Sequence, residues 1–275
     1  MHVAADPSGI ERNKVSQVFH DAATAGLSAL DFVISEAKKY GIRLIFSFVN
    51  NYKDFGGRRQ YVQWAQNAES SRLILKMILN QYYKNHVKRV MTRLNTITRI
   101  AYKNDETIMV WELMNEPRCQ SDYSGRTING WVEEMVAYVK SIDNQHLLEI
   151  GMEGFYGDSM PERKQVNPGY QVGTDFISSN LIKDIDFTTI HAYPDIWLSG
   201  QNENSQMAFM QKWVENHWAD SGKIVRKPLV ITEFGKSNKD PGFGLSSSRD
   251  SFMNTVFTDI DNLERNGGTI GGSLE

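Results

Sequence analysis

Short runs of apolar residues alternate along the chain with longer stretches in which apolar residues recur every three or four positions. The longer stretches have the period of amphipathic helices, and the short runs are typical of strands. Because parallel strands need a crossover that a helix commonly supplies, this alternation predicts an α/β fold with parallel strands. The expected strands lie at 42–50, 107–115, 146–153, 185–193, 228–234 and 269–274.

The helical spacing identifies two helices in particular. Leu30, Val33, Ile34 and Ala37 follow the pattern i, i+3, i+4, i+7, and Gly41 comes next as a stop signal. A later set has the same period, and we expect it to pack in the core. Its members are Met207, Met210, Trp213, Val214, His217 and Trp218.

The pattern near the N-terminus departs from this alternation. An apolar helical face over 15–22 stops at Gly26, and the next helical pattern begins at about Ala29. We therefore expect two adjoining helices with no strand between them, where a parallel sheet needs one. The expected strand count is six.

Several expected strands end in polar or acidic residues. Asn115 and Glu116 end one strand, and His191, Tyr193 and Glu233 lie at the ends of two others. Functional residues at the carboxyl ends of successive parallel strands are typical of a (β/α)8 barrel of the TIM type. The competing open doubly wound sheet usually has a Gly-rich phosphate turn, and the sequence contains neither GxGxxG nor GxxxxGK[ST].

Composition narrows the class of protein. The chain has 275 residues, 40% of them hydrophobic and 23% charged, with a net charge of -3, so we expect one folded domain over 1–275. A basic excess that would favour nucleic acid is missing, and no apolar run is long enough to span a membrane.

Cys119 is the single cysteine, which excludes an internal disulfide and a cysteine-based zinc site. No apolar leader pattern occurs over 1–13, so we expect no signal peptide in the chain as given.

Glu116 and Glu233 are the two candidate catalytic carboxylates. Each directly follows an apolar run and precedes Pro117 or Gly235, so we expect each carboxyl to face the mouth of the barrel. Two carboxyl groups across a cleft are the equipment for glycoside hydrolysis, in which one protonates the departing oxygen and the other attacks the sugar or activates water. The alternative is that either residue is a structural carboxylate.

Other acidic residues are weaker candidates. Glu112 and Glu149 are expected in buried networks, and Glu153 as a substrate contact. Glu133 and Glu134 are typical of the solvated face of a helix.

Four further residues are candidate substrate contacts. The amide of Asn115 could donate to a sugar hydroxyl, and the indole of Trp197, on a loop after its strand, suits stacking on a sugar ring. His191 and Tyr193 point the same way by alternation, so the tyrosine hydroxyl could hold a nucleophilic carboxylate ionised. For His191 and Tyr193 the alternative is core packing. The histidines lack metal-ligand spacing such as HExxH, so we expect no metal and no cofactor.

The chain resembles the plant endo-β-mannanases of glycoside hydrolase family 5 over nearly its whole length. The resemblance is carried by the segments VNNYKDFGG (49–57), WELMNEPRC (111–119), LEIGMEGFYG (148–157), HAYPDIW (191–197) and TEFGKS (232–237). It implies retaining hydrolysis of internal β-1,4-mannosidic bonds in mannan, galactomannan and glucomannan, with carboxyls roughly 5–5.5 Å apart. It also implies a secreted enzyme of the cell wall with no cofactor, and we expect a monomer.

The resemblance further implies a role for each candidate. Glu116 is the acid/base and Glu233 the nucleophile, while Asn115 contacts substrate, Tyr193 hydrogen-bonds Glu233 and His191 lines the cleft.

The chain departs from the family pattern in four places. The family has a first strand before the segment that begins here at Met1 and a second strand near residue 28, and this chain has no counterpart of either. The segment 69–80 is unlike the family's loop, and the chain stops at Glu275 inside the eighth strand. We therefore expect an incomplete (β/α)8 barrel, in which the loss of strands costs more than the ~5–15 kcal/mol of a typical domain's stability. The alternatives to an active mannanase are a catalytically impaired mannan-binding relic and a hydrolase of another β-1,4-glycan.

Overall fold

The computed structural model describes residues 14–52, 57, 62, 72–237, 246–265 and 270–273. Parts of the segments 49–57 and 69–80 and of the expected strand 269–274 lie outside the described residues. The chain divides into two compact units, each made of two stretches of sequence: Met1–Pro117 with Val132–Glu149, and Arg118–Trp131 with Ile150–Glu275. Each unit is described by itself below, and the single domain over 1–275 stays a prediction.

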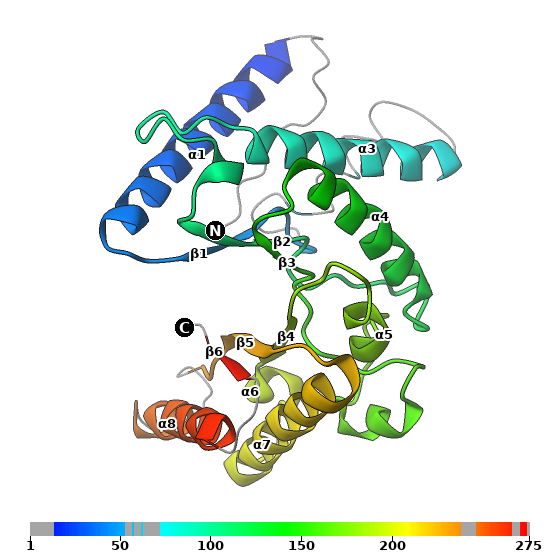
Figure 1. The fold of residues 1–275 in the computed structure, drawn as a ribbon. Coiled ribbons are helices and arrows are strands. Elements are labelled where there is room, and N and C mark those ends of the chain that lie inside the picture. Colours follow the sequence, from blue (N-terminus) through cyan, green and yellow to red (C-terminus); the bar gives the residue numbers. More distant parts are fainter. Residues whose placement is uncertain are drawn as a thin grey trace. The chain divides into compact units, whose positions relative to one another are not determined.

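The first unit contains a parallel three-stranded sheet of order β1-β2-β3 (Figure 1). Helix α1 precedes β1, helix α3 and the short 3-10 helix η2 connect β1 to β2, and α4 connects β2 to β3. The bounds are α1 Lys14–Lys39, β1 Leu44–Ser47, α3 Arg72–Met91, η2 Tyr102–Asn104, β2 Ile108–Glu112, α4 Arg126–Ile142 and β3 Leu147–Glu149.

The second unit contains another parallel three-stranded sheet, of order β4-β5-β6 (Figure 1). Helices α6 and α7 lie between β4 and β5 in the chain, and α8 lies between β5 and β6. The bounds are η3 Pro161–Val166, α5 Phe176–Asn180, β4 Thr188–Ala192, α6 Pro194–Trp197, α7 Glu203–Asp220, η4 Ser221–Val225, β5 Leu229–Phe234, α8 Ser246–Arg265 and β6 Ile270–Ser273.

All six expected strands are confirmed in the described part of the chain, and each observed strand lies inside its expected range. The observed strands are shorter because the paired ladder stops before the apolar run does. In the range 42–50, for example, Ile42 is 55% exposed and precedes β1, while Phe48 and Val49 are buried beyond its end. Apolar runs thus mark burial, and the ladder covers only their centres.

The expected break at Gly26 is wrong, because α1 is one continuous helix from Lys14 to Lys39. A glycine inside a helix costs only about 0.5–1 kcal/mol relative to alanine, which 26 residues of helical hydrogen bonding easily exceed. Leu27, Leu30 and Ile34 beyond the glycine are all buried. The helix ends at Lys39, and Gly41 two residues later has a φ of 68°, the left-handed conformation of a C-terminal stop.

Aromatic residues on β1 and β2 form the core of the first unit. The rings of Phe48 and Trp111 stack with centroids 5.2 Å apart, and Phe46 meets Trp111 edge-on at 5.5 Å. The indole of Trp111 donates to Asp143 Oδ2 at 2.8 Å, which satisfies the one polar atom of this buried ring.

A buried carboxylate, Asp31, links α1 to the segment between α3 and β2. The guanidinium of Arg93 donates to both of its oxygens, at 2.9 and 2.6 Å. The hydroxyls of Tyr102 and Thr96 and the Thr96 backbone N–H also donate to it, so the completely buried carboxylate is fully hydrogen-bonded.

The core of the second unit surrounds Trp213 on α7. Met210, Trp213, Val214 and His217 are buried, and the other two members of the predicted set, Met207 and Trp218, pack against them partly buried. The core role predicted for this set is therefore confirmed. Trp213 also donates through its indole to the backbone oxygen of His191 at 2.9 Å, which ties α7 to the end of β4.

We expect the buried His217 to make the protein less stable in mild acid. Burial lowers its pKa to about 4, and the backbone oxygens of Trp213 and Gly154 that face its ring offset only part of this. Because the unfolded chain binds this proton near pH 6.5 and the folded chain only near pH 4, the free energy of unfolding falls as the pH falls through that window.

Urea unfolding at a series of pH values measures this effect. His217→Gln has no titrating ring, so its stability should fall less steeply than that of the unsubstituted chain between pH 6.5 and 4. Equal slopes for the two proteins would contradict the prediction.

Candidate active site

In the first unit, the backbone after β2 presents Asn115 and Glu116. The Asn115 N–H donates to the Val49 oxygen at 2.9 Å, and the Asn115 oxygen accepts from the Asn51 N–H at 3.0 Å. This isolated parallel bridge between Asn50 and Asn115 continues the β1-β2 pairing past the named strands. It fixes the position of the segment that carries the first candidate carboxylate.

Glu116 has a left-handed backbone, with φ of 51°. A residue with a side chain adopts this conformation at a cost of about 1–3 kcal/mol, and such residues cluster at functional sites. Glu116 is 8% exposed, as is Asn115. The left-handed residue interrupts the extended chain directly before Pro117, and this local strain distinguishes Glu116 from an ordinary strand-end carboxylate.

In the second unit, an extra residue in β5, Thr232, sets the position of Glu233. The register shifts between Ile190 and His191, and beyond the shift His191 pairs with Glu233 and Ala192 with Phe234. Bulges re-aim the side chains of the strand that carries them, and they are common beside active sites.

His191 and Tyr193 both reach the Glu233 carboxylate, as the alternation predicts. The Tyr193 hydroxyl donates to Glu233 Oε2 at 3.0 Å, and His191 Nδ1 lies 3.5 Å from the same oxygen. The His191 side chain is completely buried, whereas the Glu233 side chain is 36% exposed. The pair therefore holds one oxygen of a carboxylate that remains accessible to solvent.

The sequence predicts Trp197 on a loop, but this residue ends the short helix α6. Pro194 at the first helical position favours the helix here because its fixed φ suits the first turn. The indole is half-buried against Phe155, Phe209 and Trp213, with ring centroids 5.4, 6.2 and 5.5 Å away. Its contact with a sugar stays a prediction.

Arg118 and Glu153 form an ion pair that the sequence did not predict. The guanidinium donates through Nε at 2.9 Å and through Nη2 at 2.6 Å to the two carboxylate oxygens, and Glu153 is 3% exposed. The Arg118 guanidinium also lies 5.9 Å from the centre of the Tyr170 ring. The Glu153 oxygens accept from Arg118, two residues after Glu116 in the sequence, and the contact of Glu153 with substrate stays a prediction.

The remaining acidic residues lie as expected. Glu112 and Glu149 are buried in β2 and β3, and Glu133 and Glu134 are exposed on α4.

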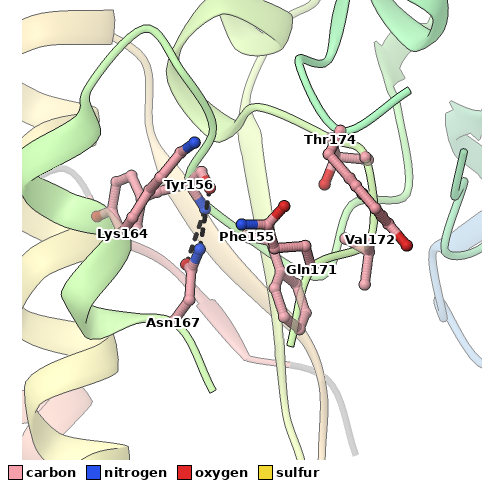
Figure 2. A pocket seen from close by; sticks show the side chains of 9 residues that line it. Phe155, Tyr156, Lys164, Asn167, Gln171, Val172 and Thr174 are labelled. Atoms are coloured by element: carbon pink, nitrogen blue, oxygen red, sulfur yellow. Dashed lines mark hydrogen bonds between the residues drawn. The ribbon is translucent and has the colours of Figure 1, made fainter. Parts of the chain in front are cut away.

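The second unit also contains a small hollow, lined by Phe155, Lys164, Asn167, Gln171 and Thr174 among others (Figure 2). The Asn167 side chain accepts from the Tyr156 N–H and donates to the Tyr156 oxygen, both at 2.9 Å. The hollow has room for about 10 Å³ of solvent, which is about one water molecule. It is therefore too small to hold a sugar ring.

Parallel strands joined by helices, with carboxylates at the strands' carboxyl ends, are typical of barrel-type glycoside hydrolases. Comparison with known proteins agrees with this class. The family described as glycoside hydrolase family 5 beta-mannosidase-like matches residues 13–274. The chain belongs to this family.

Two curated plant proteins illustrate the relationship. The chain is 59% identical to mannan endo-1,4-beta-mannosidase 5 of Solanum lycopersicum, over 100% of the chain and 73% of the relative. It is 48% identical to mannan endo-1,4-beta-mannosidase 1 of Oryza sativa subsp. japonica, over 99% of the chain and 71% of the relative. The tomato alignment runs over 307 positions against 275 residues here, so the matched part of that relative contains positions that this chain lacks.

Solved structures confirm the fold class. The endo-1,4-beta-D-mannanase of Thermotoga petrophila superimposes with a TM-score of 0.76 at 32% identity, covering 90% of this chain and 67% of that one. The endo-1,4-beta-mannanase of Rhizomucor miehei gives a TM-score of 0.70 at 27% identity, with coverage of 90% and 67%. The chain therefore has the (β/α)8 fold class of glycoside hydrolase family 5. Within the described residues, no helix is both long and apolar enough to cross a membrane.

Proposed function

We propose that this chain is a mannan endo-1,4-β-mannosidase that cleaves internal β-1,4-mannosidic bonds with retention of configuration. Family membership supports the glycoside hydrolase class, and the curated plant relatives at 59% and 48% identity are named for this activity. The observation that carries the mechanism is the Glu233 carboxylate, one oxygen of which is held by Tyr193 and approached by His191.

Glu233 acts as the nucleophile in this proposal. The hydrogen bond that the Tyr193 hydroxyl donates to Glu233 Oε2 favours the ionised carboxylate and helps to orient it. The other oxygen, Oε1, attacks the anomeric carbon of the mannose unit. The carbon–oxygen bond to the leaving sugar breaks as a covalent glycosyl–enzyme ester forms.

Glu116 acts as the general acid and then as the general base. It gives its proton to the leaving glycosidic oxygen, and it afterwards takes a proton from the water that cleaves the ester. Asn115, on the same rigidly bridged backbone, donates its amide to a hydroxyl of the reacting sugar. A hydrogen bond of this kind strengthens in the transition state, and Trp197 supplies an apolar ring surface for substrate in the second unit.

The test is the release of reducing ends by the purified chain from unbranched mannan, galactomannan and glucomannan, with soluble cellulose and xylan derivatives as comparisons. NMR of early products from a mannooligosaccharide should show the β-anomer first, because retention requires two displacements. Early α-anomer would contradict the retaining mechanism. Cleavage of the cellulose or xylan derivative alone would indicate a different β-1,4-glycan as substrate, and binding of mannan without cleavage would indicate a mannan-binding relic.

We propose further that the enzyme works as a monomer outside the cell, on wall mannans. The plant relatives named above support the location alone, because the mannans in their names are polysaccharides of the cell wall. Antibody detection in extracellular fluid against a cytosolic marker would test the location, and light scattering would test the oligomeric state.

A further inference from the structure

The backbone pairing of β4 with β5 ends close to the proposed nucleophile. The Gly235 N–H donates to the Ala192 oxygen at 3.1 Å, and this is the last rung of the ladder. Beyond it, Pro194 starts α6, and a proline has no N–H with which to continue the pairing. The two chain segments separate at this point, and the segment after β5 needs another means of attachment.

The carboxylate of Asp195 supplies that attachment. Asp195 Oδ2 accepts a hydrogen bond from the Ser237 N–H at 2.7 Å, and Asp195 is 7% exposed. A carboxylate that accepts from a backbone N–H forms a stronger hydrogen bond than a backbone carbonyl does. Asp195 thus binds the Ser237 N–H just beyond the end of the ladder.

A second contact attaches the same loop to the start of α7. Lys236 Nζ donates to Glu203 Oε1 at 2.8 Å, and the Lys236 side chain is 4% exposed. Three successive residues after β5 therefore each bind a partner at the end of β4 or in the segment that follows it. They are Gly235, Lys236 and Ser237, and their partners are Ala192, Glu203 and Asp195.

These contacts lie close in the sequence to the hydrogen bond between Tyr193 and Glu233. Tyr193 lies two residues before Asp195, and Glu233 lies four residues before Ser237. Tyr193 lies between Ala192 and Asp195, and Glu233 precedes Gly235 and Ser237, so both partners belong to segments that these two bonds tie together.

We infer that Asp195 is a positioning residue for the nucleophile. By holding the Ser237 N–H it keeps the loop after β5 against α6, and so keeps Glu233 within hydrogen-bond reach of Tyr193. This role rests on the proposed function of Glu233. Displacement of a reacting group by about 1 Å can cost about 100-fold in rate, so a lost positioning contact is expected to lower kcat far more than it changes KM.

A double-mutant cycle tests the inference on soluble mannan. Asp195→Ala should lower kcat about tenfold or more and change KM less than about threefold. Asp195→Asn keeps an oxygen that can accept from Ser237, so it should stay within about threefold of the unsubstituted chain. In a Tyr193→Phe background, which lacks the hydrogen bond to Glu233, Asp195→Ala should lower kcat by less than about threefold.

Ser237→Pro removes the donor from the other side and should reproduce the loss, which keeps the test open if Asp195→Ala does not fold. The matched controls are Ser237→Ala, which keeps the backbone N–H, and Ile196→Ala, which alters an exposed neighbour on α6. The same fractional loss in both Tyr193 backgrounds, or an unchanged kcat in Asp195→Ala, would overturn the inference alone. Absence of turnover by the unsubstituted chain would overturn the proposed function, and the inference with it.

Discussion

Glu233→Gln should reduce the release of reducing ends from mannan by about 10³-fold or more. Glutamine has nearly the same shape, and its amide oxygen can still accept from the Tyr193 hydroxyl. An amide is not a nucleophile toward the anomeric carbon, so the covalent intermediate cannot form. Initial rates at saturating soluble mannan measure the loss, and binding of mannooligosaccharide should be largely retained.

Two comparisons make the Glu233→Gln result specific. The thermal midpoint should stay within a few degrees of the unsubstituted chain, because Glu233 is partly exposed and the substitution leaves the core intact. Glu133→Gln changes an exposed glutamate on α4 and should leave activity unaltered. Residual activity above one tenth of the unsubstituted rate would rule out Glu233 as the nucleophile.

Asp31→Ala should lower the free energy of unfolding of the first unit by about 3 kcal/mol or more. The substitution removes the acceptor from Arg93, Tyr102 and Thr96 together, and it leaves the Arg93 guanidinium, which is 18% exposed, without its counter-charge. Urea unfolding at pH 7, followed by far-UV circular dichroism, gives the difference. Asp31→Asn keeps the shape and loses the charge, so its loss should be intermediate.

Asp261→Ala is the matched control for a surface ion pair. Asp261 and Arg265 contact each other on α8 with side chains 53% and 75% exposed, and such pairs contribute little. Its effect should stay within about 1 kcal/mol. A comparable effect of Asp31→Ala and Asp261→Ala would show that the buried network around Asp31 does not stabilise the unit.

The contribution of Asp31 should also depend on pH. Burial alone would raise the pKa of its carboxyl, but the hydrogen bonds from Arg93, Tyr102 and Thr96 outweigh burial and hold the pKa below its usual value. The stabilisation is therefore complete above the unfolded pKa near 3.9 and is lost as the pH falls through the lower folded value. The difference between the unsubstituted chain and Asp31→Asn should accordingly shrink in strong acid.

The sequence predicts the strands well because each is an apolar run that must be buried between flanking helices. It predicts the helix over 14–39 less well, because a glycine such as Gly26 is a common stop signal and the pattern therefore indicates two helices where the structure has one. A glycine ends a helix when its left-handed φ is used, as at Gly41, and Gly26 continues the helix instead. Local sequence does not distinguish these two uses.

In the candidate site, too, the sequence predicts some features and misses others. Alternation along β4 predicts that His191 and Tyr193 point in one direction, and both reach Glu233. The pairing of Arg118 with Glu153 joins residues 35 positions apart, and it depends on chain paths that no local pattern specifies. The available signal was an arginine two residues after Glu116 and an acid at the end of the next strand.

The two compact units interleave along the chain, since Arg118–Trp131 belongs to one and Val132–Glu149 to the other. Helix α4 starts in the first of these stretches and ends in the second. No single truncation therefore yields either unit complete and without residues of the other: a fragment that ends at Glu149 also carries Arg118–Trp131, and one that begins at Arg118 also carries Val132–Glu149. During synthesis, the first unit lacks its last residues until residue 149 has been added, and residues 118–131 of the second unit have by then already been made.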